Sequence, residues 1–251
     1  SEYQAFMQDA MHKTELMKKP AIRIEPGSYR TFIASAGVAD ILKMFSWHGL
    51  SEAAIQQGES AFGKMRNQGT MLSPLFSLAE DFSNGMVPRF NDTGEMAPER
   101  IELIARGQLE NTLVSSRTAK EYAVPSNFAA EGEDLRSPSM TTGELQEEDI
   151  LAALGTGVYL SNLHYLNWSD MIGGGITGMT RYACFWVEDG EIKGPIENMR
   201  FDDSIYRFLG DKLEAVTATA RVNPEVGTYE GREFSATTCP GILLSSFALT
   251  L

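Results

Sequence analysis

Residues 51–56 have the spacing of a zinc-binding motif but lack its histidines. The segment Ser51-Glu52-Ala53-Ala54-Ile55-Gln56 follows the pattern His-Glu-x-x-x-His, with Ser51 and Gln56 at the two histidine positions. Serine and glutamine are poor zinc ligands, because zinc prefers imidazole nitrogen, thiolate or carboxylate. We therefore expect no catalytic residue, no metal ligand and no cofactor in this chain, and no stoichiometric zinc in the purified protein.

His48 offers an alternative, because it stands four residues before Glu52. In a helix that spacing places both side chains on one face, where they could supply two metal ligands or a base with its orienting partner. A catalytic zinc normally takes three protein ligands, and the sequence does not indicate the third. The other interpretation is that a hydrogen bond satisfies Glu52 while His48 caps or packs.

A second group with possible chemistry is His164 and Asn167, which a glycine-rich stretch at 173–178 follows. Glycines there would let the backbone approach a ligand closely, or would only permit tight turns. The stretch lacks the Lys-Ser/Thr ending of a P-loop, and the sequence has neither a Gly-x-Ser-x-Gly elbow nor a Rossmann fingerprint. Phosphate binding and serine hydrolysis are therefore not indicated.

Composition restricts the partners of this 251-residue chain. Its 21 Lys and Arg residues against 34 Asp and Glu residues give a net charge of −13, which repels phosphate backbones and disfavours nucleic acid. No apolar stretch approaches the roughly 18–20 residues of a membrane helix, and the first 19 residues do not resemble a secretory signal. Cys184 and Cys239, far apart in sequence, indicate two buried thiols in a cytoplasmic protein.

Hydrophobic periodicity and turn residues predict an α+β fold in which antiparallel β-sheet hairpins alternate with interspersed helices. The clearest hairpins join residues 100–104 to 109–114, and residues 182–187 to 191–193 across Asp189-Gly190. A loop is expected at 127–140, and residues 73–89 fit either a strand or a loop. Helices are expected at 3–18, 38–65, 117–122, 144–154 and 204–209, and further strands at 21–25, 158–160, 213–221 and 242–251.

From Gly157 onward the order of motifs becomes specific. The segments GVYLSNLHYLN (157–167), GGGITG (173–178), FWVEDGEI (185–192) and PIE (195–197) closely resemble the C-terminal domain of the TldD/PmbA family, bacterial and archaeal metallopeptidase proteins once labelled modulators of DNA gyrase. The earlier segments follow the family's order. The resemblance implies a C-terminal domain at 21–251, and at 1–20 a linker helix from an N-terminal domain that this sequence does not contain.

The resemblance also implies a branch of the family. The TldD branch binds zinc through a His-Glu-x-x-x-His helix and a cysteine near the C-terminus, whereas the PmbA branch, also called TldE, lacks these ligands and pairs with TldD. Here the cysteine position falls in residues 225–230, which contain no cysteine. The chain therefore resembles the PmbA/TldE branch.

By that resemblance, a TldD-like partner would supply the zinc for peptide maturation and degradation. This chain would shape the chamber and hold unfolded peptide, with Glu52, His164 and Asn167 as substrate-binding residues and strand addition at hairpin edges as the mode of capture. Two alternatives remain open. One is an autonomous metallopeptidase with a non-standard site at His48 and Glu52, and the other is a scaffolding homodimer without enzyme activity.

Overall fold

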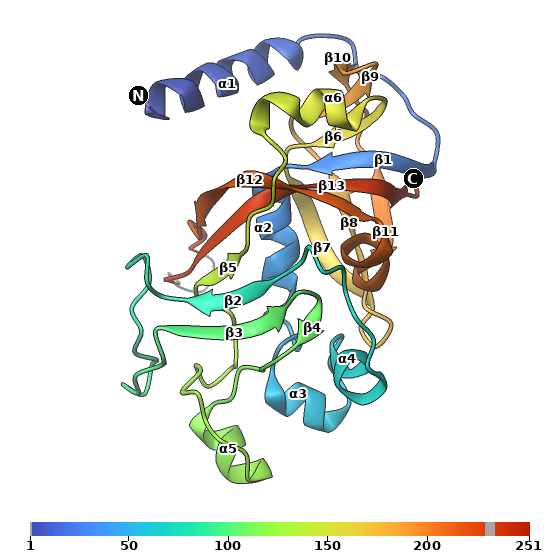
Figure 1. The fold of residues 1–251 in the computed structure, drawn as a ribbon. Coiled ribbons are helices and arrows are strands. Elements are labelled where there is room, and N and C mark those ends of the chain that lie inside the picture. Colours follow the sequence, from blue (N-terminus) through green and yellow to red (C-terminus); the bar gives the residue numbers. More distant parts are fainter. Residues whose placement is uncertain (1, 229–233) are drawn as a thin grey trace.

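The computed structural model describes residues 2–228 and 234–251 and joins their strands into one large, open sheet (Figure 1). Two long strands at its centre are β1 (Gly27–Ile33) and β13 (Ala236–Leu249), which pair antiparallel. The main path of the sheet runs β10 (Glu191–Pro195), β9 (Cys184–Glu188), β6 (Gly157–Leu160), β1, β13, β5 (Pro138–Met140), β2 (Leu78–Asp81), β3 (Arg100–Ala105) and β4 (Gln108–Leu109).

Most neighbouring strands are antiparallel, as expected, with parallel pairs at β1–β6 and β13–β5. The remaining strands are β7 (Leu163–Asp170), β8 (Gly175–Thr180), β11 (Arg200–Ser204) and β12 (Leu213–Pro224), which attach to the main path through β13. The predicted fold class, α+β with antiparallel hairpins and interspersed helices, is confirmed.

The first predicted strand, at residues 21–25, is wrong. There Ile22 makes only an isolated bridge to Ile196, and the strand begins at Gly27. The burial along β1 rises toward its end, where Thr31, Phe32 and Ile33 are enclosed between β13 and β6. Pairing on both sides therefore selects the later segment, although the earlier one alternates equally well in sequence.

A single helix at 38–65 is also wrong, because this segment forms three helices. They are α2 (Ser35–Met44), α3 (Glu52–Gln57) and α4 (Gly63–Gln68). A Cβ atom at Gly49 would lie 2.4 Å from the Phe45 carbonyl oxygen, so the chain reverses tightly after α2. Gly58 ends α3 with a left-handed φ of 76°, which glycine adopts at little cost.

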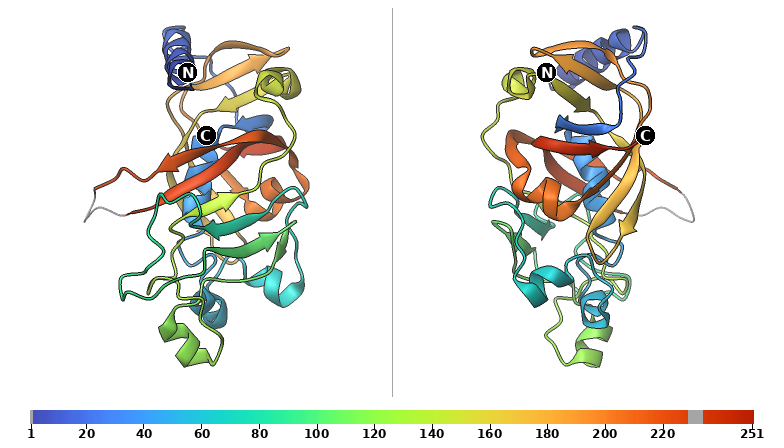
Figure 2. Two further views of the ribbon diagram at one scale, coloured as in Figure 1. Left: turned by 60° about the vertical axis from the view of Figure 1, so that its left-hand side comes forward. Right: turned by 90° about the vertical axis from the view of Figure 1, so that its right-hand side faces the viewer.

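Helix α2 occupies the centre of the molecule and is crossed by β12 and β13 (Figures 1 and 2). It also contacts β7, so sheet strands surround it on more than one side. Its buried residues Val38, Ile41 and Leu42 join the main hydrophobic core. This burial fixes the helix against the strands that carry the polar residues described below.

Both predicted hairpins are confirmed, although β4 is shorter than the predicted second arm. The β9–β10 turn has Asp189 at φ 51° and Gly190 at φ 77°, the pair of left-handed residues that a tight hairpin needs. In the β3–β4 turn, Arg106 and Gly107 have φ values of 48° and 80°. These turns are local, so a short segment of sequence predicts them.

The hairpin of β7 and β8 was not predicted. Residues 173–178 were expected to form a glycine-rich loop, but Gly175 already begins β8, which pairs with both β7 and β11. A Cβ at Gly178 would lie 2.7 Å from the Phe201 ring. Glycine is therefore required there for close packing between strands and not for a loop conformation.

The other helices lie near their predicted positions. They are α1 (Glu2–Leu16), α5 (Ser116–Tyr122), the 3-10 turn η1 (Glu147–Asp149) followed by α6 (Ile150–Leu154), and the π-helical turn η2 (Arg207–Asp211). In Figure 1, α1 lies at one end of the molecule and α3, α4 and α5 at the other. Across the residues described, every helix is too short or too polar to cross a bilayer.

Candidate functional site

A cavity of about 390 Å³ lies where α2 meets β7 and the end of β12. Its polar wall combines side chains from distant parts of the sequence, because the fold brings the middle of α2 against the start of β7 and the segment after β12. The chemically relevant lining residues are Asp40 and Lys43 from α2, Asn162 and His164 near the start of β7, and Asn223 and Glu225 from the end of β12.

Asp40 has the most unusual protonation among these residues. Its Oδ2 accepts a hydrogen bond from the Leu163 backbone N–H at 3.0 Å. Burial raises the pKa of Asp40 to about 6; the Leu163 N–H and the charge of Lys43 oppose this rise, and the charge of Glu225 adds to it. A carboxyl group with a raised pKa on a cavity wall is a candidate for function.

Lys43 and Glu225, which both line the cavity, form an ion pair. The bond from Lys43 and the Gly227 backbone N–H, at 2.8 Å from Oε1, hold the pKa of Glu225 below its usual range. Glu225 begins the segment 225–230, where the cysteine of the TldD branch would fall, and Tyr229 and Glu230 of that segment lie outside the described residues. The charged pair therefore borders the site that the resemblance assigned to the third zinc ligand.

Of the two predicted substrate-binding residues on β7, His164 lines the cavity and Asn167 does not. A bulge separates them, with Tyr165 at a left-handed φ of 51° and its ring 4.3 Å from the His164 ring. Asn167 is exposed and its Oδ1 accepts a hydrogen bond from the Trp168 N–H. The bulge thus changes the direction of the strand between the two residues.

Leu135 and Pro138 also line the cavity, and Glu80 of β2 is the strand partner of Pro138. Glu80 Oε1 accepts backbone N–H bonds from Arg136 and Ser137 at 2.8 and 3.0 Å, whereas Oε2 has no partner within the described residues. Burial raises the pKa of Glu80 to about 7, because burial disfavours the ionised carboxylate relative to the neutral acid.

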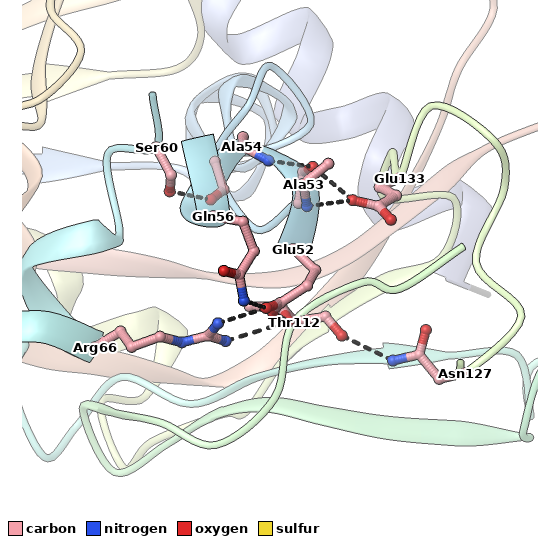
Figure 3. A network of polar contacts seen from close by, with 11 residues as sticks. Glu52, Ala53, Ala54, Gln56, Ser60, Arg66, Thr112, Asn127 and Glu133 are labelled. Atoms are coloured by element: carbon pink, nitrogen blue, oxygen red, sulfur yellow. Dashed lines mark hydrogen bonds and ion pairs between the residues drawn. The ribbon is translucent and has the colours of Figure 1, made fainter. Parts of the chain in front are cut away.

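Glu52, the third predicted substrate-binding residue, is 4% exposed and does not line this cavity. Figure 3 shows it among its hydrogen-bond partners. Its carboxylate accepts hydrogen bonds from Arg66 at 2.7 Å, from Gln56 at 2.8 Å and from Thr112. Burial raises the pKa of Glu52, but these three donors outweigh it and hold the pKa below its usual value. The network joins α3 to α4 and to the segment after β4.

Ser51 is the N-cap of α3: its Oγ accepts a hydrogen bond from the Ala54 N–H at 3.1 Å. The same hydroxyl donates to Glu133 Oε2 at 2.6 Å, which also accepts from the Ala53 N–H at 3.0 Å (Figure 3). Glu133 Oε1 accepts from the Ser115 N–H at 2.8 Å, before α5. Ser51 is therefore part of a buried capping network that connects α3 with α5.

The helical pairing of His48 with Glu52 is wrong. His48 lies in the turn before α3, with φ 55°, and its Nδ1 is 4.0 Å from Glu59. Its side chain is 64% exposed, whereas that of Glu52 is enclosed among its donors. The reversal at Gly49 separates the two residues, so the i, i+4 spacing does not place them on one helix face.

Both cysteines are buried, as predicted. Burial raises the pKa of Cys184 to about 11 and that of Cys239 to about 12. Among residues 2–228 and 234–251, which the structure describes, no three His, Cys, Asp or Glu side chains form a group that could hold a metal ion.

Sequence reasoning missed Asp40, Lys43 and Glu225. The acid and base three residues apart at Asp40 and Lys43 were a usable signal, because that spacing places both on one face of a helix. Treating residues 38–65 as one amphipathic helix directed attention to Glu52 instead. Glu225 had no such signal, because only the fold brings it to α2.

A family model described as the PmbA/TldA metallopeptidase C-terminal domain matches residues 26–251. No match to a curated protein sequence was found. TldE from Thermococcus kodakarensis has a similar structure, with a TM-score of 0.74, 16% identity, and coverage of 99% of this chain and 55% of that protein.

Two proteins described as proposed modulators of DNA gyrase are also similar in structure. The protein from Thermotoga maritima has a TM-score of 0.73 and 18% sequence identity, and the match covers 92% of this chain and 51% of the Thermotoga chain. The protein from Bacteroides thetaiotaomicron has a TM-score of 0.74 and 16% sequence identity, and the match covers 97% of this chain and 51% of the Bacteroides chain. The chain thus spans about half the length of these proteins. With the family model matching nearly its whole length, the chain belongs to the PmbA/TldA metallopeptidase C-terminal domain family.

Proposed function

We propose that this chain is a PmbA/TldE-like subunit that pairs with a TldD-like zinc peptidase and holds unfolded peptide near the metal of its partner. In this proposal residues 21–251 form the C-terminal domain, and residues 1–20 form the helix that links it to an N-terminal domain. The protein acts in the cytoplasm on peptides during their maturation and degradation, without nucleic acid or membrane.

One observation carries the proposal: the α2 cavity is lined by an ion pair, a carboxyl group and an imidazole, while Ser51 and Gln56 at α3 stand at the histidine positions of the zinc motif. Such a wall can bind and orient a polar peptide chain. The likeness to a structure named TldE supports the same branch of the family.

β7 supports a mode of peptide capture. Within the described residues this strand pairs along one edge, with β8, and it carries both His164 and Asn167. An extended peptide that adds to its other edge would lie beside the cavity, with main-chain hydrogen bonds for affinity and cavity contacts for selection. Glu52 has no place in this proposal, because Arg66, Gln56 and Thr112 already occupy its carboxylate.

The test is peptide cleavage by the chain reconstituted with a TldD-type partner. His164→Ala and Asn167→Ala should lower the cleavage rate, by up to roughly a hundredfold if the peptide is misplaced, while assembly and melting temperature stay nearly unchanged. His48→Ala is the matched control and should retain full activity. Cleavage by the chain alone that His48→Ala abolishes would instead establish an autonomous peptidase. A TldD-type partner that is equally active without this chain would refute the proposal.

A further inference from the structure

Three side chains on the wall of the α2 cavity that could donate hydrogen bonds have partners within the protein. Lys43 directs its ammonium group to Glu225. With its amide group in the orientation that satisfies both of its ends, Asn162 donates its NH₂ to the carbonyl oxygens of Arg181 and Tyr182, at 2.8 and 2.9 Å. Asn223 donates its NH₂ to the Ser35 hydroxyl at 2.9 Å. The Lys43, Asn162 and Asn223 side chains are therefore engaged within the protein, and the His164 imidazole and the hydroxyls of Ser46, Ser235 and Thr237 complete the polar wall.

Asp40 is the acceptor that remains underused. Among the residues that the structure describes, its carboxylate receives one hydrogen bond, from the Leu163 N–H to Oδ2. An ionised carboxylate has about four lone-pair positions and is costly to desolvate without partners. A ligand that fits this wall must bring hydrogen-bond donors and preferably a positive charge.

We propose that the α2 cavity binds the primary ammonium group of a peptide, with the Asp40 carboxylate as its counter-ion. This inference rests on the proposed function and specifies the chemical group that the site recognises. An ammonium group brings three donors and no acceptor, which complements the open acceptor positions of the Asp40 carboxylate. The two sources of such a group in a peptide are its free amino terminus and a lysine side chain.

The surrounding charges are consistent with this ligand. Lys43 is ion-paired with Glu225, so their opposite charges offset each other beside Asp40. His164 on β7 also faces the cavity, and Cys239 lies near Asp40 as a neutral thiol because burial raises its pKa to about 12. An incoming ammonium would favour the ionised form of Asp40 and lower its pKa from about 6.

The experiment compares three unfolded peptides of otherwise identical sequence by titration calorimetry with the full chain at pH 7.5. One has a free amino terminus and no lysine, one is acetylated without lysine, and one is acetylated with a single lysine. Acetylation without lysine should weaken binding at least tenfold. The acetylated lysine peptide reports whether a side-chain ammonium restores binding or only the terminus is recognised.

Asp40→Asn should abolish the difference between free and blocked peptides, whereas the control Asp189→Asn, in an exposed turn that tolerates asparagine, should retain it. Melting temperatures of both variants verify folding. Equal binding of all three peptides, or full discrimination in Asp40→Asn, would overturn this inference and leave the proposed function standing. Failure of every peptide to bind the chain and its reconstituted pair would contradict the proposed function itself.

Discussion

The molecule contains two helix-borne carboxylates in opposite situations. Glu52 on α3 accepts three side-chain hydrogen bonds, and its pKa lies below the usual value. Asp40 on α2 accepts one backbone hydrogen bond beside a cavity, and burial raises its pKa to about 6. A carboxylate whose bonds are complete stabilises the fold, whereas one that the fold leaves incomplete is available to a ligand. Glu52, the carboxylate in the zinc-like motif, therefore has the structural role, and Asp40 is the one available to a ligand.

The strongest way to break this comparison is Glu52→Ala. Removing the carboxylate leaves Arg66 and Thr112 without their partner in a largely enclosed network, so we expect a loss of roughly 2–4 kcal/mol in the free energy of unfolding. Chemical denaturation at pH 7.5 measures this loss. Glu52→Gln, which keeps the shape of the side chain, should cost less. A change below about 0.5 kcal/mol for Glu52→Ala would show that the network is not structural.

Asp40→Asn should have the opposite sign. The pKa of Asp40 in the folded protein, about 6, lies above its ordinary value of 3.8, so ionisation opposes folding. The stabilising contribution of the protonated form is complete below about pH 4 and is lost as pH rises through 6. The variant should therefore be more stable than the parent above pH 6, by roughly 1–2 kcal/mol.

Denaturant unfolding from pH 4 to pH 8 measures this difference, which should vanish at the acidic end. The same variant is expected to lose peptide discrimination, so stability and binding would change in opposite directions. Equal stability of variant and parent over the whole range would contradict the raised pKa of Asp40.

The smallest effect is expected for Ser51→Ala. The substitution removes the N-cap of α3 and the hydrogen bond to Glu133, which should cost roughly 1 kcal/mol of stability. Cleavage by the reconstituted pair should persist, because Ser51 lies in the capping network and not in the cavity. Thermal melting against Ser28→Ala, an exposed serine on β1, isolates the cap. A loss of cleavage at unchanged stability would assign chemistry to α3.

Local signals in the sequence predicted several elements well. Asp189-Gly190 predicted its hairpin because the turn needs two left-handed residues in a row. The segment after Gly157 predicted the family, which the match over residues 26–251 confirms. Of the site, the sequence identified only His164 among the cavity residues, and it overlooked Asp40, Lys43 and Glu225.

The sequence by itself determined the antiparallel hairpin architecture, the family and the absence of histidines at the zinc-motif positions, because these depend on residues near one another in the chain. Tertiary structure decided where residues 38–65 break, which of 21–25 and 27–33 becomes a strand, and which carboxylate is enclosed. Those outcomes depend on strand partners and packing contacts from distant segments. Residues 27–33 form β1 because they pair with β13, and the end of β12 brings Glu225 to Lys43 of α2. Periodicity within a segment cannot supply that information, because burial of a residue depends on what the rest of the chain places against it.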